Sequence, residues 1–289
     1  MPPKSMKNNA VLLISCPDQK GLVATVSDFI FKHNGNIVHT DEHTDAELER
    51  FLMRVEWNLD GFDLVLQDFP RAFAPIADRF EMQWRVANCA DRSRMAIFVS
   101  KYDHCLADLL YRQQSGELAC DIPLIISNHA DCQKLAEFYR IPYQLIPVTK
   151  ETKQQAEAEQ LRLLREYKID VVVLARYMQV LSTEFIRQYP NRIINIHHSF
   201  LPAFIGAKPY HQAFERGVKL IGATCHYVTA ELDAGPIIEQ DTSRIDHGDT
   251  VDDLLRIGRD VERAVLARGL RWHLEDRVLL NGSRTVVFP

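Results

Sequence analysis

Residues 95–127 read MAIFVSKYDHCLADLLYRQQSGELACDIPLIIS, and this stretch decides the fold. It opens with the apolar run MAIFVS, continues through CLADLLYRQQSGE, which has helical composition, and closes with the apolar run CDIPLIIS. Strands that are apolar throughout are buried on both faces, as in a parallel sheet covered by helices. We therefore expect a strand–helix–strand unit of a parallel sheet in this stretch.

The same alternation continues from this unit to residue 197. Strands are expected in YQLIPV (143–148), IDVVVLA (169–175) and RIINIH (192–197). The intervening segments DCQKLAEFYR, KQQAEAEQLRLLREYK and STEFIRQYP are expected to be helices. Strands alternating with helices predict a doubly wound, mostly parallel, Rossmann-like α/β domain, which we place at residues 94–289.

The beginning of the chain has a different pattern. Strand, helix, strand, strand, helix, strand is the expected order, with Leu22, Val26 and Ile30 on one face of the first helix. The second helix is expected within residues 63–80, although two prolines obscure its start. This order predicts a ferredoxin-like βαββαβ domain at residues 1–86, with a polar linker at 87–93.

Composition excludes several classes of protein. The chain has 289 residues, a formal net charge of -5 and a pI near 6.1, which argue against a nucleic-acid or anionic-membrane partner. No apolar run is long enough to span a bilayer, and the N-terminus has no export signal, so we expect a cytoplasmic protein. Six scattered cysteines without a CxxC pair predict neither a zinc ribbon nor a disulfide framework.

A polar pair ends the expected strand 192–197. Asn195 and His197 are two residues apart, so they face the same side while Ile196 faces the other. Ligands of such sheets bind beyond the carboxyl ends of the strands, where an amide and an imidazole can hold a carbonyl oxygen as it becomes an oxyanion. Asp233, in the turn LDAGP, offers a carboxylate that can order a water molecule.

The segments INIHHSFLPAFIGAKPYHQA and GATCHYVTAELDAGPIIEQD resemble the Asn-x-His and Asp loops of the hydrolases and transferases that use formyltetrahydrofolate. DQKGLVATVSDFIFKHNGNI is similar to part of an ACT domain. The two together resemble the formyltetrahydrofolate deformylase family over nearly the whole chain. The resemblance implies hydrolysis of 10-formyltetrahydrofolate to formate and tetrahydrofolate, without a metal or other cofactor. Such hydrolysis would supply formate for purine synthesis and balance the one-carbon pool.

The resemblance also implies roles for single residues. Asn195 would bind the formyl oxygen, protonated His197 would stabilise the tetrahedral oxyanion, and Asp233 would orient and deprotonate water. The folate would lie against a loop and a backbone edge made of Tyr177, Met178, Gln179, Val180, Leu181, Glu231 and Leu232. Supporting positions near the site are His198, Ser199, Lys208, Lys101 and His104.

For the N-terminal domain, the ACT resemblance implies an amino-acid effector, glycine or methionine, and a homo-oligomer. The loop CPDQKG leads into a helix N-terminus, which suits a carboxylate. The residues expected to shape the effector site are Asp18, Gly21, Asn34 and Asn36.

Four alternatives compete with a metal-free hydrolase. A formyltransferase acting on a phosphorylated amine would need a glycine-rich turn after the first strand of the second domain, and SKYDHCLADLL contains no glycine. A transferase acting on a non-phosphorylated amine, or a regulatory folate- or amino-acid-binding protein, stays open. A zinc site on His197, His198, His226 and Asp233 is disfavoured because adjacent strand residues point to opposite sides.

Overall fold

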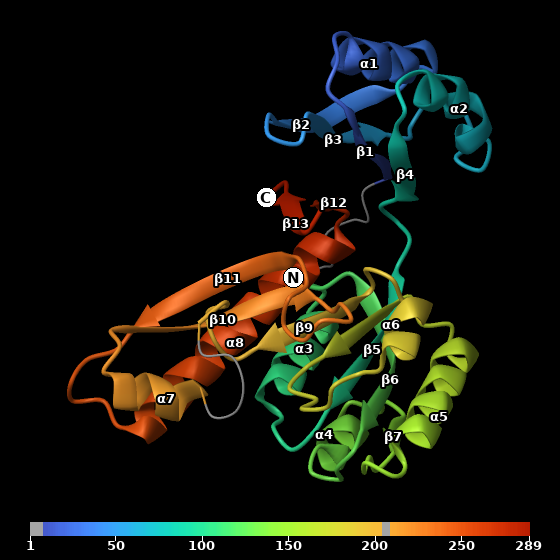
Figure 1. The fold of residues 1–289 in the computed structure, drawn as a ribbon. Helices are drawn as coiled ribbons and strands as arrows, with labels where there is room; N and C mark the ends of the chain where they lie inside the picture. Colours follow the sequence, from blue (N-terminus) through green and yellow to red (C-terminus); the bar gives the residue numbers. More distant parts are fainter. Residues whose placement is uncertain (1–7, 204–208) are drawn as a thin grey trace. The chain divides into compact units, whose positions relative to one another are not determined.

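The structure is a computed structural model, and it describes residues 8–203 and 209–289 (Figure 1). The chain divides into two compact units. The first unit contains the residues up to Arg92 together with Glu275–Pro289, and the second contains Ser93–Leu274. The sequence places residues 275–289 in the second domain, whereas the structure groups them with the first.

The first unit is built on a four-stranded antiparallel sheet in the order β2-β3-β1-β4. Its elements are β1 (Asn9–Pro17), α1 (Leu22–Lys32), β2 (Asn36–Asp45), β3 (Arg50–Asn58), α2 (Phe69–Arg79) and β4 (Gln83–Asn88). This order confirms the ferredoxin-like βαββαβ plan. Helix α2 begins at Phe69, later than residue 63, because Pro70 fits the first turn of a helix, where its missing N–H costs nothing.

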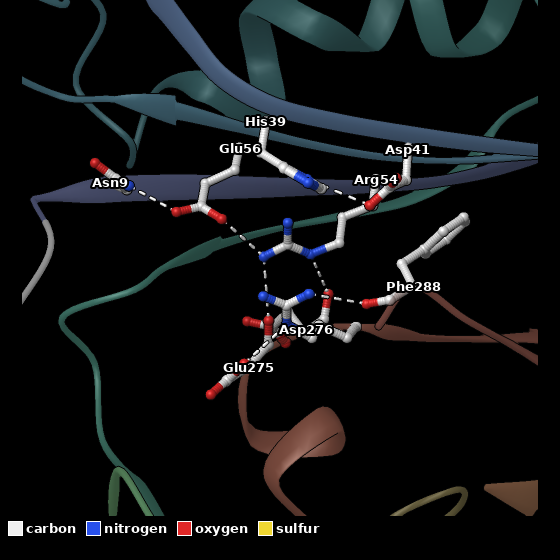
Figure 2. Close-up of polar contacts among 9 residues, drawn as sticks. Asn9, His39, Asp41, Arg54, Glu56, Glu275, Asp276 and Phe288 are labelled. Atoms are coloured by element: carbon white, nitrogen blue, oxygen red, sulfur yellow. Dashed lines mark hydrogen bonds and ion pairs between the residues drawn. The ribbon is translucent and has the colours of Figure 1, made fainter. Parts of the chain in front are cut away.

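The C-terminal segment adds a hairpin to this unit, formed by β12 (Val278–Asn281) and β13 (Arg284–Val287). Arg54 on β3 donates to the main-chain oxygens of Glu275 and Asp276, at 3.3 and 3.0 Å (Figure 2). Met53 and Val55 belong to the core under the helices, so Arg54 faces the other side of the sheet. The polar contacts of Figure 2 therefore fasten the chain's last segment to the sheet face away from α1 and α2.

The second unit contains a seven-stranded sheet in the order β11-β10-β9-β8-β5-β6-β7. Its strands are β5 (Ser93–Val99), β6 (Cys120–Ser127), β7 (Tyr143–Leu145), β8 (Val171–Leu174), β9 (Ile193–His197), β10 (Leu220–Tyr227) and β11 (Ile237–Arg244). All pairs from β9 to β7 are parallel, while β10 is antiparallel to both its neighbours. The sheet is thus mostly parallel, as predicted.

Helices cover the sheet of the second unit (Figure 1). They are α3 (His104–Gln114), α4 (Gln133–Phe138), α5 (Lys153–Glu166), α6 (Thr183–Gln188), α7 (Pro209–Arg216) and α8 (Val251–Leu274). Side chains of α5 and α6 share one apolar core with β5, β6, β8 and β9. Helix α8 lies against β10 and β11 and also contacts α3. Within the described residues, we find no helix that combines the length and the apolar character needed to cross a membrane.

Candidate active site

Strand β9 presents Asn195 and His197 to one side of the sheet. The strand lies between β8 and β10, and His197 is its last residue. His197 is only 6% exposed, and Asn195 is half-buried. A rigid strand fixes both side chains more closely than a loop would, so the predicted shared orientation of the pair follows from the backbone.

Asp233 reaches His197 from the turn between β10 and β11. Its Oδ2 lies 3.3 Å from His197 Nδ1. Asp233 has a left-handed backbone, with a φ of 55°. At Gly235, two residues later, an added Cβ would overlap the carbonyl group of Tyr227. Since only glycine lets the turn approach β10 this closely, the sequence DAG places the carboxylate beside the histidine.

Electrostatics keep this carboxylate ionised. The hydrogen bond from His197 is the largest influence, and it lowers the pKa of Asp233 from its ordinary value. An ionised Asp233 accepts a hydrogen bond from Nδ1–H, so Nδ1 carries a hydrogen. His197 Nε2 is buried and has no hydrogen-bond partner among the described residues. This nitrogen is therefore the one available to a bound molecule.

His226 completes the polar cluster; the sequence suggests it only as a candidate zinc ligand and does not indicate its contact with Asn195. Strand β10 pairs His226 directly with Asn195, and His226 Nε2 lies 3.1 Å from Asn195 Nδ2. His226 Nδ1 lies 2.9 Å from the carbonyl oxygen of Tyr227, so it is the protonated nitrogen and Nε2 accepts from the amide. Burial lowers the pKa of His226, which suits a neutral ring. His226 thereby fixes which end of the Asn195 amide donates.

The loop expected to hold the folate follows β8, and its side chains alternate between core and solvent. Tyr177 is buried in the core, where its hydroxyl accepts from Gln160 Nε2 at 2.8 Å, and Leu181 belongs to the same core. Met178 and Val180 are more than half exposed, at 55% and 56%. The phenol of Tyr177 is thus engaged inside the protein, whereas Met178 and Val180 are open to a flat ring.

The other expected folate contacts lie in the turn that carries Asp233. Glu231 and Leu232 are both exposed, and the main-chain oxygen of Glu231 accepts from the Thr229 hydroxyl at 3.1 Å. Gln179, in the loop after β8, is half-buried. An exposed Leu232 beside the buried Asp233–His197 pair offers a second apolar contact next to the polar groups.

The residues expected to support the site have different surroundings in the structure. Ser199 donates to the main-chain oxygen of Ala203 at 2.7 Å and so shapes the turn after β9. His198 is half-buried, and burial lowers its pKa to about 3, which keeps its ring neutral. Lys101 is exposed, and His104 contacts a carboxylate of α8 instead of the Asn–His–Asp group. Lys208 lies outside the described residues.

The residues expected to bind an effector do not meet at one point in the first unit. Asp18 and Gly21 precede α1, and Gly21 is its left-handed N-cap residue. Asn34 and Asn36 follow α1, and the Asn34 amide donates to the carbonyl of Gly61 at 2.8 Å. Since α1 is about 16 Å long at 1.5 Å per residue, the two turns lie at opposite ends of it.

Among the described residues, one group of side chains has the spacing of metal ligands: His104, Cys105 and Glu262. The histidines beside Asp233 do not form such a group there. Both oxygens of Glu262 already contact protein groups, including the Arg176 guanidinium at 3.3 Å. A cation beside the carboxylate opposes a second positive charge, so the group fits an ion-pair network better than a metal site.

Comparisons with known proteins identify the family of this chain. The model of the formyl transferase family matches residues 93–270. A formyltetrahydrofolate deformylase from Synechocystis is 55% identical over 279 residues, 96% of this chain and 98% of the relative. The crystal structure of a formyltetrahydrofolate deformylase from Pseudomonas syringae, 53% identical, superposes with a TM-score of 0.96 and covers 99% of this chain and 96% of its own.

A transferase of the same fold is more distant. Glycinamide ribonucleotide transformylase 1 from Symbiobacterium toebii is 30% identical, with a TM-score of 0.65, and the match covers 68% of this chain and 95% of that one. The deformylases match both units, whereas this transferase leaves about a third of the chain unmatched. The chain therefore belongs to the formyltetrahydrofolate deformylase family.

Proposed function

We propose that this chain hydrolyses 10-formyltetrahydrofolate to formate and tetrahydrofolate, with Asn195, His197 and Asp233 as its catalytic residues. One observation carries the assignment of the site: the buried His197 Nε2 has no partner in the part of the chain that the structure describes, while Nδ1 is paired with the ionised Asp233. A polarised imidazole with one free nitrogen, beside an amide donor on the same strand face, is suited to a formyl oxygen.

The reaction follows from these contacts. With the His197 ring protonated on both nitrogens, the Asn195 amide and His197 Nε2–H donate to the formyl oxygen as water attacks the formyl carbon. Asp233 takes a proton from that water, and the negative charge of the tetrahedral intermediate stays on the oxygen between Asn195 and His197. When the carbon–nitrogen bond breaks, the protonated Asp233 gives its proton to the folate nitrogen. Formic acid leaves and releases its own proton to water to become formate. No covalent bond to the protein forms, and no metal is needed for any step.

Binding of the folate would use the apolar groups beside this site. Met178, Val180 and Leu232 expose flexible or branched side chains, which can pack against a flat heterocycle. Main-chain groups near Glu231 and Leu232 would read the ring's edge. The buried Tyr177 and Leu181 side chains would support the folate site indirectly, because they fix this loop to the apolar core.

The test is formate release from 10-formyltetrahydrofolate by the purified protein, in the presence of a chelator and without any amine. We expect rapid release, lost in Asp233→Asn. If formate appears only after an amine is added, the protein is a transferase. If a chelator stops the reaction, the metal-free mechanism is wrong.

The first unit would act as an ACT-like regulatory domain of a homo-oligomeric, cytoplasmic enzyme. Its ferredoxin-like sheet supports the regulatory role, and six scattered cysteines without a CxxC pair suit a reducing compartment. In this role the domain would adjust the supply of formate for purine synthesis and the balance of one-carbon groups. Formate release measured with added glycine or methionine tests the effector, and light scattering tests the oligomer. A rate independent of both amino acids would remove the effector proposal.

A further inference from the structure

A buried carboxylate joins three segments of the second unit outside the Asn–His–Asp group. The side chain of Glu262, on α8, is only 1% exposed. Its Oε2 lies 2.8 Å from His104 Nε2, at the start of α3. Its Oε1 accepts from the Tyr210 hydroxyl of α7 at 2.7 Å and lies 3.3 Å from the Arg176 guanidinium. These four residues form what we call the Glu262 network.

Arg176 is the member of the network that leads toward the proposed site. It lies between β8 and Tyr177, in a left-handed conformation with a φ of 63°. Arginine rarely adopts this conformation, which persists only where the surroundings hold it. Its guanidinium is centred 5.1 Å above the Tyr102 ring and pairs with Glu262. The Arg176 side chain is therefore held by Tyr102 and by Glu262. Arg176 is also the first residue of the loop that we propose contacts the folate.

A glycine on helix α8 allows the Tyr210 ring to approach Glu262. Gly258 is one turn before Glu262, and a Cβ there would overlap the phenol of Tyr210. Glycine inside a helix costs about 1 kcal/mol relative to alanine. The Tyr210 ring occupies the space that a side chain at residue 258 would fill. With a larger residue there, the Tyr210 hydroxyl could not reach Glu262.

We infer that Glu262 is a positioning residue for folate binding: it anchors Arg176 and thereby fixes the loop 176–181 that exposes Met178 and Val180. The inference rests on the proposed function, because it assumes that this loop contacts the folate. Glu262 itself would touch no substrate atom. The catalytic side chains lie on β9 and on the β10–β11 turn, so the network should affect binding far more than the chemical step.

The test compares Glu262→Gln with Glu239→Gln. Glu239 is a matched control, since it is also a mostly buried carboxylate paired with an arginine of α8, Arg268, at 2.9 Å. We expect Glu262→Gln to weaken tetrahydrofolate binding roughly tenfold, the scale of substitutions that act through an intermediate element, and to raise KM similarly. We expect kcat to stay within about threefold, because ground-state binding is what is lost.

Two further variants keep the test decisive if Glu262→Gln does not fold, since it leaves the Arg176 cation without its counter-charge. The double variant Arg176→Gly/Glu262→Gln removes both charges, and glycine suits the left-handed backbone. Gly258→Ala instead pushes Tyr210 away without changing any charge. We expect weaker tetrahydrofolate binding in both, with a larger change in the double variant.

Isothermal titration calorimetry with tetrahydrofolate reads binding even if the protein releases no formate. Failure of the proposed hydrolysis is thus separate from failure of this inference. Unchanged tetrahydrofolate affinity in a folded Glu262→Gln or double variant would overturn the inference. So would a large fall in kcat with unchanged affinity, which would place Glu262 in the chemistry. Loss of affinity on adding a chelator to the unmodified protein would point instead to a metal held by His104, Cys105 and Glu262.

Discussion

At the scale of single residues, the two nitrogens of His197 have different surroundings. Nδ1 is paired with Asp233, while Nε2 is buried and has no hydrogen-bond partner in residues 8–203 and 209–289. Asn195 is fixed in turn by His226, whose Nε2 accepts from the amide. The pair His197–Asp233 thus carries charge, whereas the pair His226–Asn195 orients a neutral hydrogen-bond donor. This division predicts that Asp233 and Asn195 contribute to different parts of the reaction.

Asp233→Asn should remove the base and the negative charge beside His197. We expect kcat to fall roughly 10²–10⁴-fold, the usual cost of lost acid–base assistance. Tetrahydrofolate affinity should stay within about threefold, because the exposed folate contacts are untouched. Formate release and calorimetric titration measure the two effects. A collapse of affinity with unchanged kcat would contradict the role of Asp233 as base.

The lowered pKa of Asp233 predicts a pH dependence of stability. A carboxyl group whose pKa is lower in the folded than in the unfolded state stabilises the fold above the unfolded value, near 3.9. That contribution disappears as the pH falls through the folded value. The hydrogen bond from His197 is the largest cause of the lowering. We therefore expect the free-energy gap between the unmodified protein and Asp233→Asn to be constant near neutral pH and to shrink below about pH 4.

Urea unfolding curves collected from pH 3 to 8 measure this gap. Asp233→Glu is the control, since it keeps a carboxyl group on a longer side chain. A gap that widens as the pH falls would show that the pKa of Asp233 is raised, not lowered.

The sequence indicates the three proposed catalytic residues more readily than the residues that hold them in place. The period of two along β9 suffices to put Asn195 and His197 on one face, and a rigid turn suffices to suggest Asp233. His226 could not be predicted, because its partner is set by the pairing of β10 with β9. Glu262 and Arg176 are 86 residues apart, and no local pattern indicates that they meet. The contact of Tyr177 with the folate stays a prediction, and the hydrogen bond of its hydroxyl with Gln160 follows from no local pattern.

At the scale of elements, the turn between β10 and β11 determines where the carboxylate lies. Gly235→Ala should displace this turn, because the new Cβ would overlap the carbonyl of Tyr227. We expect kcat to fall at least tenfold, since a shift of about 1 Å in a catalytic group can cost 10²-fold. We also expect a loss of stability of about 1–3 kcal/mol, the usual cost of overpacking. Formate release and thermal unfolding measure both.

Gly217→Ala is the matched control for the turn. Gly217 has a positive φ of 65°, but an added Cβ there meets no atom of the described residues within 4 Å. This variant should lose about 1 kcal/mol of stability through backbone strain, with unchanged kcat. Equal kcat values for Gly235→Ala and the unmodified protein would show that the position of Asp233 tolerates movement of the turn.

Element order is the part of the fold that sequence patterns capture. Apolar runs distinguish the buried parallel strands from the partly alternating strands of the first unit, and both sheets are found as predicted. Boundaries are less predictable. The strand expected at 143–148 is β7, Tyr143–Leu145, which ends before Pro147. A proline cannot donate to a sheet, so the tertiary pairing stops earlier than the apolar pattern.

At the scale of the whole molecule, the chain returns to its first unit after the second is complete. Arg54, buried on β3, donates to main-chain oxygens of Glu275 and Asp276. The Asn281 amide, in the hairpin, donates to Asp45 Oδ2 at 2.7 Å. Neither contact follows from a local pattern, since the partners are more than 200 residues apart. A domain boundary drawn from the sequence therefore misses this segment.

A chain that ends at Leu274 should have a less stable first unit. Arg54 would keep its ion pair with Glu56, at 3.1 Å, but would lose both main-chain acceptors. Hydrogen bonds to a charged group contribute about 1.5–3 kcal/mol each, so we expect the free energy of unfolding of this unit to fall by about 3 kcal/mol or more. Hydrogen exchange of the β3 amides measures the change.

Arg284→Ala provides the control for this truncation. It removes only an exposed ion pair with Glu47, at 3.2 Å, and pairs of this kind contribute little. The amides of β3 should therefore exchange as in the unmodified protein. If the β3 amides exchange faster in the truncated chain but not in Arg284→Ala, the loss of stability is due to the buried contacts of Arg54 and to the hairpin. Unchanged exchange in the truncated chain would show that the sheet of the first unit does not depend on the returning segment.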